Sequence, residues 1–272
     1  MRKRNWIKRV CEEKSIRACF WVLGIMVLLA VLVPAMSPYP YDAQDINLQN
    51  QGISFEHLFG TDKFGRDIFT RSCYGLRVSL LVGFGSTTIC VIIAIFVGTI
   101  AGSSRGLIDD VILEIMNVIS AIPSMIYVIL MLLVLEASVK SVIIGICISG
   151  WIDLAKMIRT ETRRLRQMDY CIAAEMMEIS RLRIVRKYIL PNELKLLVGQ
   201  MILMIPKAMF TEAFLSFLGI GISAPRASLG MLIRDAKIMI LQYPTQILFP
   251  IMMLVVLVTC LQSLGYLIEK KI

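Results

Sequence analysis

Four stretches of this chain run for 19 to 31 residues without a charged side chain: residues 18–36, 78–102, 115–135 and 238–268. An α-helix rises about 1.5 Å per residue, so about 20 apolar residues cross the roughly 30 Å hydrocarbon core of a bilayer. A soluble domain has no core wide enough to bury several such helices. The composition agrees, because 57% of the residues are hydrophobic and only 18% are charged, against about 25% charged in an average soluble protein. The chain is therefore predicted to be an all-α integral membrane protein.

Two further spans are predicted from weaker patterns. Residues 138–158 have only a short uncharged centre, and residues 196–217 are long enough to cross but carry Lys207 and Glu212. With these two segments the prediction is six transmembrane helices, which places both termini on the same side of the membrane.

The basic residues orient these helices. The formal net charge is +9, and 20 of the 29 Lys and Arg residues lie in segments that six crossings place on one side, together with both termini. Cytosolic loops of membrane proteins carry such an excess of Lys and Arg. Both termini are therefore predicted to be cytosolic, and the positive charge is assigned to membrane topology rather than to a nucleic-acid partner.

The predicted organisation is simple. Residues 1–17 form a cytosolic basic leader, and residues 18–272 form a single membrane domain with an outer loop at 37–77 and a cytosolic segment at 159–194. The first apolar run, 18–36, could also be a cleaved signal peptide. We favour a retained helix, because the run is longer than the roughly 7–15 residues of a signal core.

The sequence offers no chemistry of its own. Its seven cysteines include no CxxC pair, and six of them are predicted to lie in the membrane or the cytosol, so neither a metal site nor a disulfide framework is expected. The sequence contains no GxxxxGK[ST] motif to cradle nucleotide phosphates. The single histidine, His57, is expected to be a surface residue of the outer loop. We therefore predict a chain that is not an enzyme and binds no cofactor.

The cytosolic segment between the fourth and fifth helices carries the clearest pattern. Ile172, Met176 and Ile179 recur at helical spacing, while Glu175 and Glu178 fall on a different face. This predicts a short amphipathic helix over residues 169–183, after which Pro191 turns the chain back into the membrane. Such a helix could lie in the lipid headgroups, or it could enter a groove on a cytosolic partner.

At this point the sequence resembles a known family. The run Ala173-Ala174, followed by Ile189-Leu190-Pro191-Asn192, is similar to the coupling-loop signature of ATP-binding-cassette importer permeases. The family's Trp, Ala and Arg before the loop correspond to Trp151, Ala155 and Arg159. Two positions depart, since Ile172 replaces the family's leading Glu and Glu178 replaces its Gly. The resemblance implies that the ATPase-coupling residues are Ile172, Ala173, Ala174, Glu175, Met176, Glu178, Ile179 and Leu182.

Two more segments narrow the resemblance. The outer-loop run His57-Leu58-Phe59-Gly60-Thr61-Asp62-Lys63-Phe64-Gly65-Arg66-Asp67 is similar to a stretch of the second permease subunit in the peptide/nickel subgroup, and residues 212–221 resemble the family's fifth helix. In the first run, Gly60 and Gly65 allow tight turns, and the Asp and Arg residues can pair locally. A turn that satisfies its own polar groups is therefore the main expectation for this loop.

The resemblance implies a function and partners. The chain would form half of the translocation path of an ATP-driven importer for peptides, in the cell membrane of a prokaryote. It would pair with a homologous permease subunit, two cytosolic ATP-binding subunits and an extracytoplasmic solute-binding protein, all around the lipid bilayer. Nickel–chelator complexes are the alternative cargo. An ion-coupled secondary transporter is the alternative class, and it would need ionisable groups near broken helices inside the membrane.

Two features within the predicted spans remain open. Lys207 either is satisfied by backbone carbonyls inside the bundle, or lines the substrate path and meets an anionic group, or reaches the membrane surface. Glu212 is also a substrate-path candidate. It lies five positions after Lys207, which places the two side chains on different faces of a helix, so Glu212 is a poor partner for Lys207. Gly98 and Gly102 form a GxxxG pattern, for which packing within the chain is favoured over a subunit interface.

Overall fold

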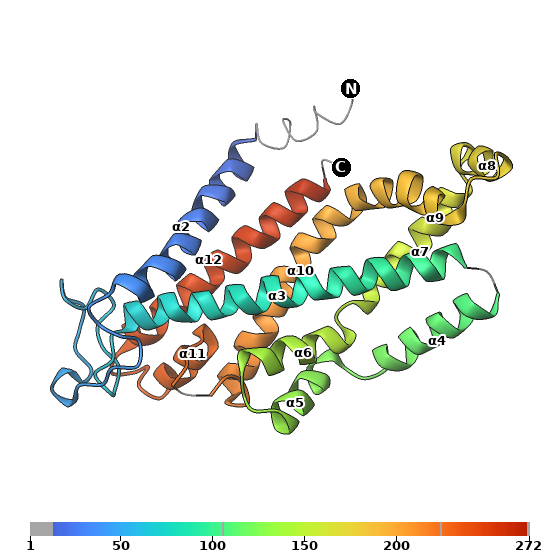
Figure 1. The fold of residues 1–272 in the computed structure, drawn as a ribbon. Coiled ribbons are helices and arrows are strands. Elements are labelled where there is room, and N and C mark those ends of the chain that lie inside the picture. Colours follow the sequence, from blue (N-terminus) through green and yellow to red (C-terminus); the bar gives the residue numbers. More distant parts are fainter. Residues whose placement is uncertain (1–12, 105, 224, 271–272) are drawn as a thin grey trace.

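The computed structural model describes residues 13–104, 106–223 and 225–270, and in these residues the chain is an elongated bundle of helices (Figure 1). Residues 1–12 of the predicted leader lie outside the described residues. The elements in chain order are α2 (Lys14–Met36), η1 (Ile46–Leu48), α3 (Ile68–Ser103), α4 (Leu107–Ser120), α5 (Ser124–Val134), α6 (Val139–Ser149), α7 (Ile152–Arg166), α8 (Asp169–Met176), α9 (Arg181–Ile184), the π-helical turn Val185–Ile189, α10 (Leu190–Leu218), α11 (Leu229–Lys237) and α12 (Pro244–Glu269).

The predicted fold class is confirmed. Five segments are long and apolar enough to cross a membrane, namely α2, α3, the α6–α7 pair, α10 and α12. The pair α4–α5 makes a sixth span if its two parts are counted as one. Figure 1 shows α2, α3, α10 and α12 running along the bundle, with the loop before α3 at one end and α8 at the other. The start of α2 and the end of α12 both lie away from the loop before α3.

The third span is not the unbroken helix that the run 115–135 suggested. Its two parts, α4 and α5, are bent by 72° at a short break. Pro123 lies in this break, where it has no backbone N–H to donate and disfavours a helical conformation at Ile122. The helix therefore stops at Ser120 and restarts at Ser124.

The outer loop is shorter than predicted and holds itself together. α3 begins at Ile68 rather than near residue 78, because the Asp67 carboxylate caps it by accepting from the Thr70 N–H at 2.7 Å. Asp67 also binds His57 Nδ1 at 2.9 Å, and His57 is only 2% exposed, so the expectation of a surface histidine is wrong. The sequence alone could not show that the loop folds over this ring.

The predicted local pairing in this loop is confirmed. Arg66 Nε donates to Asp62 Oδ2 at 2.7 Å, within a turn that closes with Gly65 at a φ of 71°. A Cβ at Gly65 would lie 1.8 Å from the Asp45 carbonyl oxygen, so only glycine fits there. The loop is thereby fixed against the start of α3.

α3 and α7 pack closely along the GxxxG pattern. A Cβ on Gly98 would lie 2.6 Å from the Ala155 carbonyl oxygen, and one on Gly102 would lie 2.6 Å from that of Arg159. Both glycines therefore face α7 of the same chain, which confirms packing within the chain. By contrast α2 contributes little buried surface, since 11% of its most apolar window is buried, as expected for a helix that faces lipid.

We predict that Gly98→Val destabilises the bundle by about 1–3 kcal/mol, because the new side chain must push α7 away from α3. Gly24→Val in α2 is the control, since a Cβ there has nothing within 4 Å. Thermal unfolding of the detergent-purified protein measures the difference. Equal midpoints for the two variants would contradict the close packing.

Candidate coupling helix and membrane cavity

The short helix α8 lies beyond the end of α7 and packs one side back onto the chain. Cys171 and Ala174 are buried on this inner side, against Leu165 at the end of α7 and Ile184 in α9. Burial raises the pKa of the Cys171 thiol, so this group stays protonated and serves as a packing residue. The inner side therefore positions α8, and only its outer side is free for a partner.

The outer side exposes large apolar side chains. Met176 is 81% exposed, Ile172 is 42% exposed, and Leu182 at the start of α9 is 67% exposed. Met177 and Tyr170 are also exposed. Exposed apolar groups clustered on a short helix are typical of a docking surface rather than of a solvated one.

The structure corrects the predicted helix over residues 169–183. α8 ends at Met176, and the next residues turn the chain back, with Glu178 at a φ of 56°. The Ile179 N–H donates to the Ala174 carbonyl at 3.1 Å, and the Glu178 N–H donates to that of Glu175 at 3.0 Å, the two bonds of a Schellman cap. As a result Ile179 packs inward with Ala174 and does not share the exposed face of Ile172 and Met176.

Ion pairs and a hydrogen bond hold α8 and α7 against the rest of the bundle. Arg166 donates to the Ser103 carbonyl at the end of α3 at 2.6 Å and to the Glu175 carboxylate in α8 at 2.9 Å. Earlier in α7, Arg159 binds Asp109 of α4 through two bonds of 2.5 and 2.7 Å. Asp109 is only 1% exposed. The predicted coupling residue Glu175 is thus partly committed to its own chain. The role of Asp109 was not anticipated, because 50 residues separate it from Arg159.

The chain does not turn at Pro191 as predicted. The π-helical turn Val185–Ile189 leads directly into α10, and Pro191 occupies the first turn of that helix, where a missing N–H costs nothing. The Asn192 side chain donates to the Tyr188 carbonyl at 2.8 Å, which satisfies one carbonyl at this junction. α10 therefore connects continuously to the α8–α9 segment.

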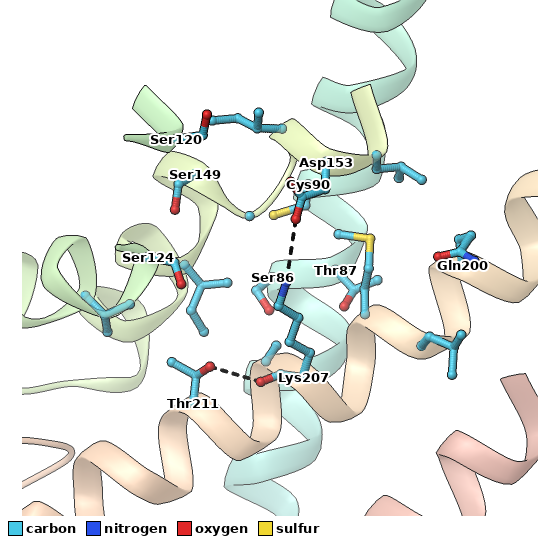
Figure 2. A pocket seen from close by; sticks show the side chains of 18 of the residues that line it. Ser86, Thr87, Cys90, Ser120, Ser124, Ser149, Asp153, Gln200, Lys207 and Thr211 are labelled. Atoms are coloured by element: carbon cyan, nitrogen blue, oxygen red, sulfur yellow. Dashed lines mark hydrogen bonds and ion pairs between the residues drawn. The ribbon is translucent and has the colours of Figure 1, made fainter. Parts of the chain in front are cut away.

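A cavity of about 400 Å³ lies between α3, α5, α7 and α10 (Figure 2). Lys207 of α10 and Asp153 of α7 face each other across it, with Nζ and Oδ2 3.7 Å apart. Most other polar groups around it are hydroxyls, and the polar lining comprises Ser86, Thr87, Ser120, Ser124, Ser149, Gln200 and Thr211.

The two substrate-path candidates fall in different places. The Lys207 side chain lines the cavity, is 75% exposed and has a carboxylate partner, rather than the backbone carbonyls considered from the sequence. Glu212 is fully buried and accepts hydrogen bonds from Ser216 at 2.8 Å and Ser79 at 3.2 Å. Glu212 is therefore no partner of Lys207, as predicted, and lies between α10 and α3 rather than in the cavity wall.

Asp153 is the cavity residue that the sequence interpretation missed. It lies 54 residues from Lys207, so no local spacing connects them. The available signal was an acid within the predicted span 138–158. Ionisable groups beside broken helices were named above as marks of a secondary transporter. Since this chain has them, they do not separate the two transporter classes.

Comparisons with known proteins do separate them. Residues 94–272 match the family described as binding-protein-dependent transport system inner membrane component. Residues 4–52 match the N-terminal TM domain of oligopeptide transport permease C.

Individual proteins agree. The dipeptide transport system permease protein DppC of Bacillus subtilis is 35% identical over 228 residues, which cover 84% of this chain and 71% of that protein. The oligopeptide transport system permease protein OppC of Escherichia coli is 30% identical over 260 residues, covering 95% and 86%. A solved structure of the MetNI methionine ABC transporter in an inward-facing conformation matches with a TM-score of 0.59 at 18% identity, over 73% of this chain and 94% of that one. This last likeness concerns the fold.

We predict that Glu178→Gly stabilises the turn after α8 by up to about 1 kcal/mol, because it removes the cost of a left-handed backbone at a residue with a Cβ. Amide hydrogen exchange over residues 177–184 should become slower. Ala173→Gly within α8 is the control, and should make exchange faster, since glycine in a helix costs about 0.5–1 kcal/mol. Faster exchange in Glu178→Gly would show that the turn does not favour glycine.

Proposed function

The chain belongs to the family of binding-protein-dependent transport system inner membrane components, and on this premise we propose that it forms half of the translocation path of an ATP-driven peptide importer. In this role α8 receives the movement of an ATPase, and the cavity beside Lys207 belongs to the path of the cargo. The observation that carries the proposal is the form of α8, an apolar surface bonded through Arg166 to the end of a membrane helix.

The proposed coupling surface comprises the exposed residues of α8 and α9. A groove on a cytosolic ATPase would take up Met176, Ile172 and Leu182, as helix-in-groove recognition does elsewhere. The Arg166 bonds to α3 and α8 support this role, because they make the surface move together with the membrane helices. Ala174 and Ile179 contribute by holding α8 in place rather than by contact with the ATPase.

The other proposed partners supply the parts of an ATP-driven importer that this chain does not provide. Its sequence has no phosphate-cradling motif, so ATP hydrolysis is assigned to two partner ATPases. A homologous permease would supply the second half of the path. An extracytoplasmic solute-binding protein would deliver cargo at the end that carries the outer loop.

Peptides are the proposed cargo. The relatives described above are named as dipeptide and oligopeptide permeases, which supports peptides over nickel–chelator complexes. The proposed orientation places the α8 end in the cytosol, together with both termini, in the cell membrane of a prokaryote. The excess of Lys and Arg in the segments at this end supports it.

We predict that Met176→Asp strongly lowers ATP-driven uptake and the coupling of ATP hydrolysis to it, because a carboxylate would be desolvated in an apolar groove. The protein should remain in the membrane in normal amount, since Met176 is 81% exposed and packs against nothing that holds the fold. Met176→Leu keeps an apolar side chain and should couple normally. Uptake by proteoliposomes that contain the complete importer measures both variants. Normal coupled uptake in Met176→Asp would remove Met176 from the docking surface.

The orientation is tested with two single cysteines in a variant that lacks the seven native ones. Phe55→Cys in the fully exposed tip of the outer loop should react with an impermeant maleimide added to whole cells. Arg164→Cys near the end of α7 should react only after the membrane is opened. The reverse pattern would overturn the orientation while leaving the fold unaffected.

A further inference from the structure

We propose that Asp153 and Lys207 form a binding station for the two charged ends of a short peptide, Asp153 for the ammonium group and Lys207 for the carboxylate. The proposal rests on the proposed function, since it specifies how the same permease would hold that cargo. The fold by itself does not imply that this cavity binds a ligand. The two charges assign a binding site to it and indicate the chemistry of the ligand.

The charges themselves point to a cavity filled with water or ligand. Both side chains lie on helices that cross the membrane, yet Lys207 is 75% exposed and Asp153 is 86% exposed. Charged groups in membrane helices face a bundle interior or a water-filled space, because contact with lipid is costly. Both residues line the same cavity, so that cavity is the space that they face (Figure 2).

Several helices that border the cavity are interrupted or contain a proline. The break between α4 and α5 contributes Ser120, Pro123 and Ser124 to the cavity wall, and the junction of α6 and α7 contributes Gly150. Pro206 directly precedes Lys207 within α10. Irregular backbone is tolerated at membrane depth where it lines a cavity, and the substrate sites of other transporters are built on such discontinuous helices.

The hydroxyl lining has unused hydrogen-bonding capacity. Among the described residues, the side-chain oxygens of Thr87 and Ser149 are buried without a hydrogen-bond partner, and both residues line the cavity. A buried hydroxyl without a partner is unfavourable. The amide and carbonyl groups of a peptide backbone can bond to hydroxyls that line the cavity, which a purely apolar cargo could not do.

The ion pair between Asp153 and Lys207 is weak enough to be replaced by a ligand. Its 3.7 Å separation is longer than a charge-assisted hydrogen bond of about 2.7–2.9 Å, and exposed pairs of this kind contribute little stability. Asp109 and Glu212, two buried carboxylates, differ, since each has close partners of its own. A peptide that inserts between Asp153 and Lys207 would therefore exchange one weak pair for two direct contacts.

The size of the cavity limits the cargo. Ligand pockets generally span about 300–1,000 Å³, and this one holds about 400 Å³. A short peptide fits that volume, and the second permease would cover the open side of the cavity.

The experiment measures uptake of trialanine, a peptide whose only charges are its termini, by proteoliposomes that hold the complete importer with its ATPases and solute-binding protein. The variants are Lys207→Met, Asp153→Asn and the two combined. Each single variant should lose about tenfold in uptake, as expected for one charge-assisted contact, and the double variant about a hundredfold. Lys207→Arg and Asp153→Glu keep the charges and should retain most of the uptake. All variants should insert into the membrane in normal amount.

The double variant separates a binding station from a structural bridge. If the pair served only to hold α7 against α10, removing the second charge would restore what removing the first had lost, and the double variant would match or exceed the singles. That result, or normal uptake in either single variant, would overturn the station and leave the importer function in place. Absence of trialanine and all other peptide uptake in the unmodified importer would instead overturn the proposed function itself.

Discussion

The close contact between α3 and α7 determines the arrangement of the rest of the molecule. Gly98 and Gly102 let the two helix backbones approach until a single added methyl group would meet a carbonyl oxygen. In a membrane, where apolar side chains gain little by leaving lipid for one another, such close packing is a main source of helix association. Asp153 in the cavity wall lies on α7, and α8 follows directly after its end.

α7 links the two candidate sites. Near its start it carries Asp153 in the cavity wall, and at its end Arg166 binds both α3 and α8. Its 15 residues span about 22 Å at about 1.5 Å per residue. Under the proposed function, a displacement of α8 by an ATPase would act on the cavity through α7 and, by way of α9, through α10. The buried Asp109, which binds Arg159, ties the same helix to α4 and hence to the bent pair that lines the cavity.

The two departures from the coupling signature have different physical consequences. Glu178 occupies the left-handed position that ends α8, where a glycine is the easier residue, so the change costs energy without altering the turn. Ile172 replaces an acid on the exposed face, which makes that face more apolar. Under the proposed function, the surface offered to the ATPase would depend more on apolar contact and less on charge than the family signature implies.

The sequence by itself determined the membrane class, the positions of the spans and the family, because each follows from local runs and motifs. Apolar stretches of about 20 residues are stable as helices that span a membrane. The segments 173–192 and 57–67 resemble the family over contiguous residues, so the family can be recognised without the tertiary structure. The local pairing of Asp62 with Arg66 was predictable for the same reason.

Only the tertiary structure decided which residues meet across the bundle. The pairing of Lys207 with Asp153, the burial of His57 against Asp67 and the inward turn of Ile179 all depend on how helices and turns are placed in three dimensions. Helical periodicity assigns a residue to a face only while the helix continues, and it ends at Met176, before the predicted stripe does. Contacts between residues 50 or more positions apart depend on packing, which no local spacing records.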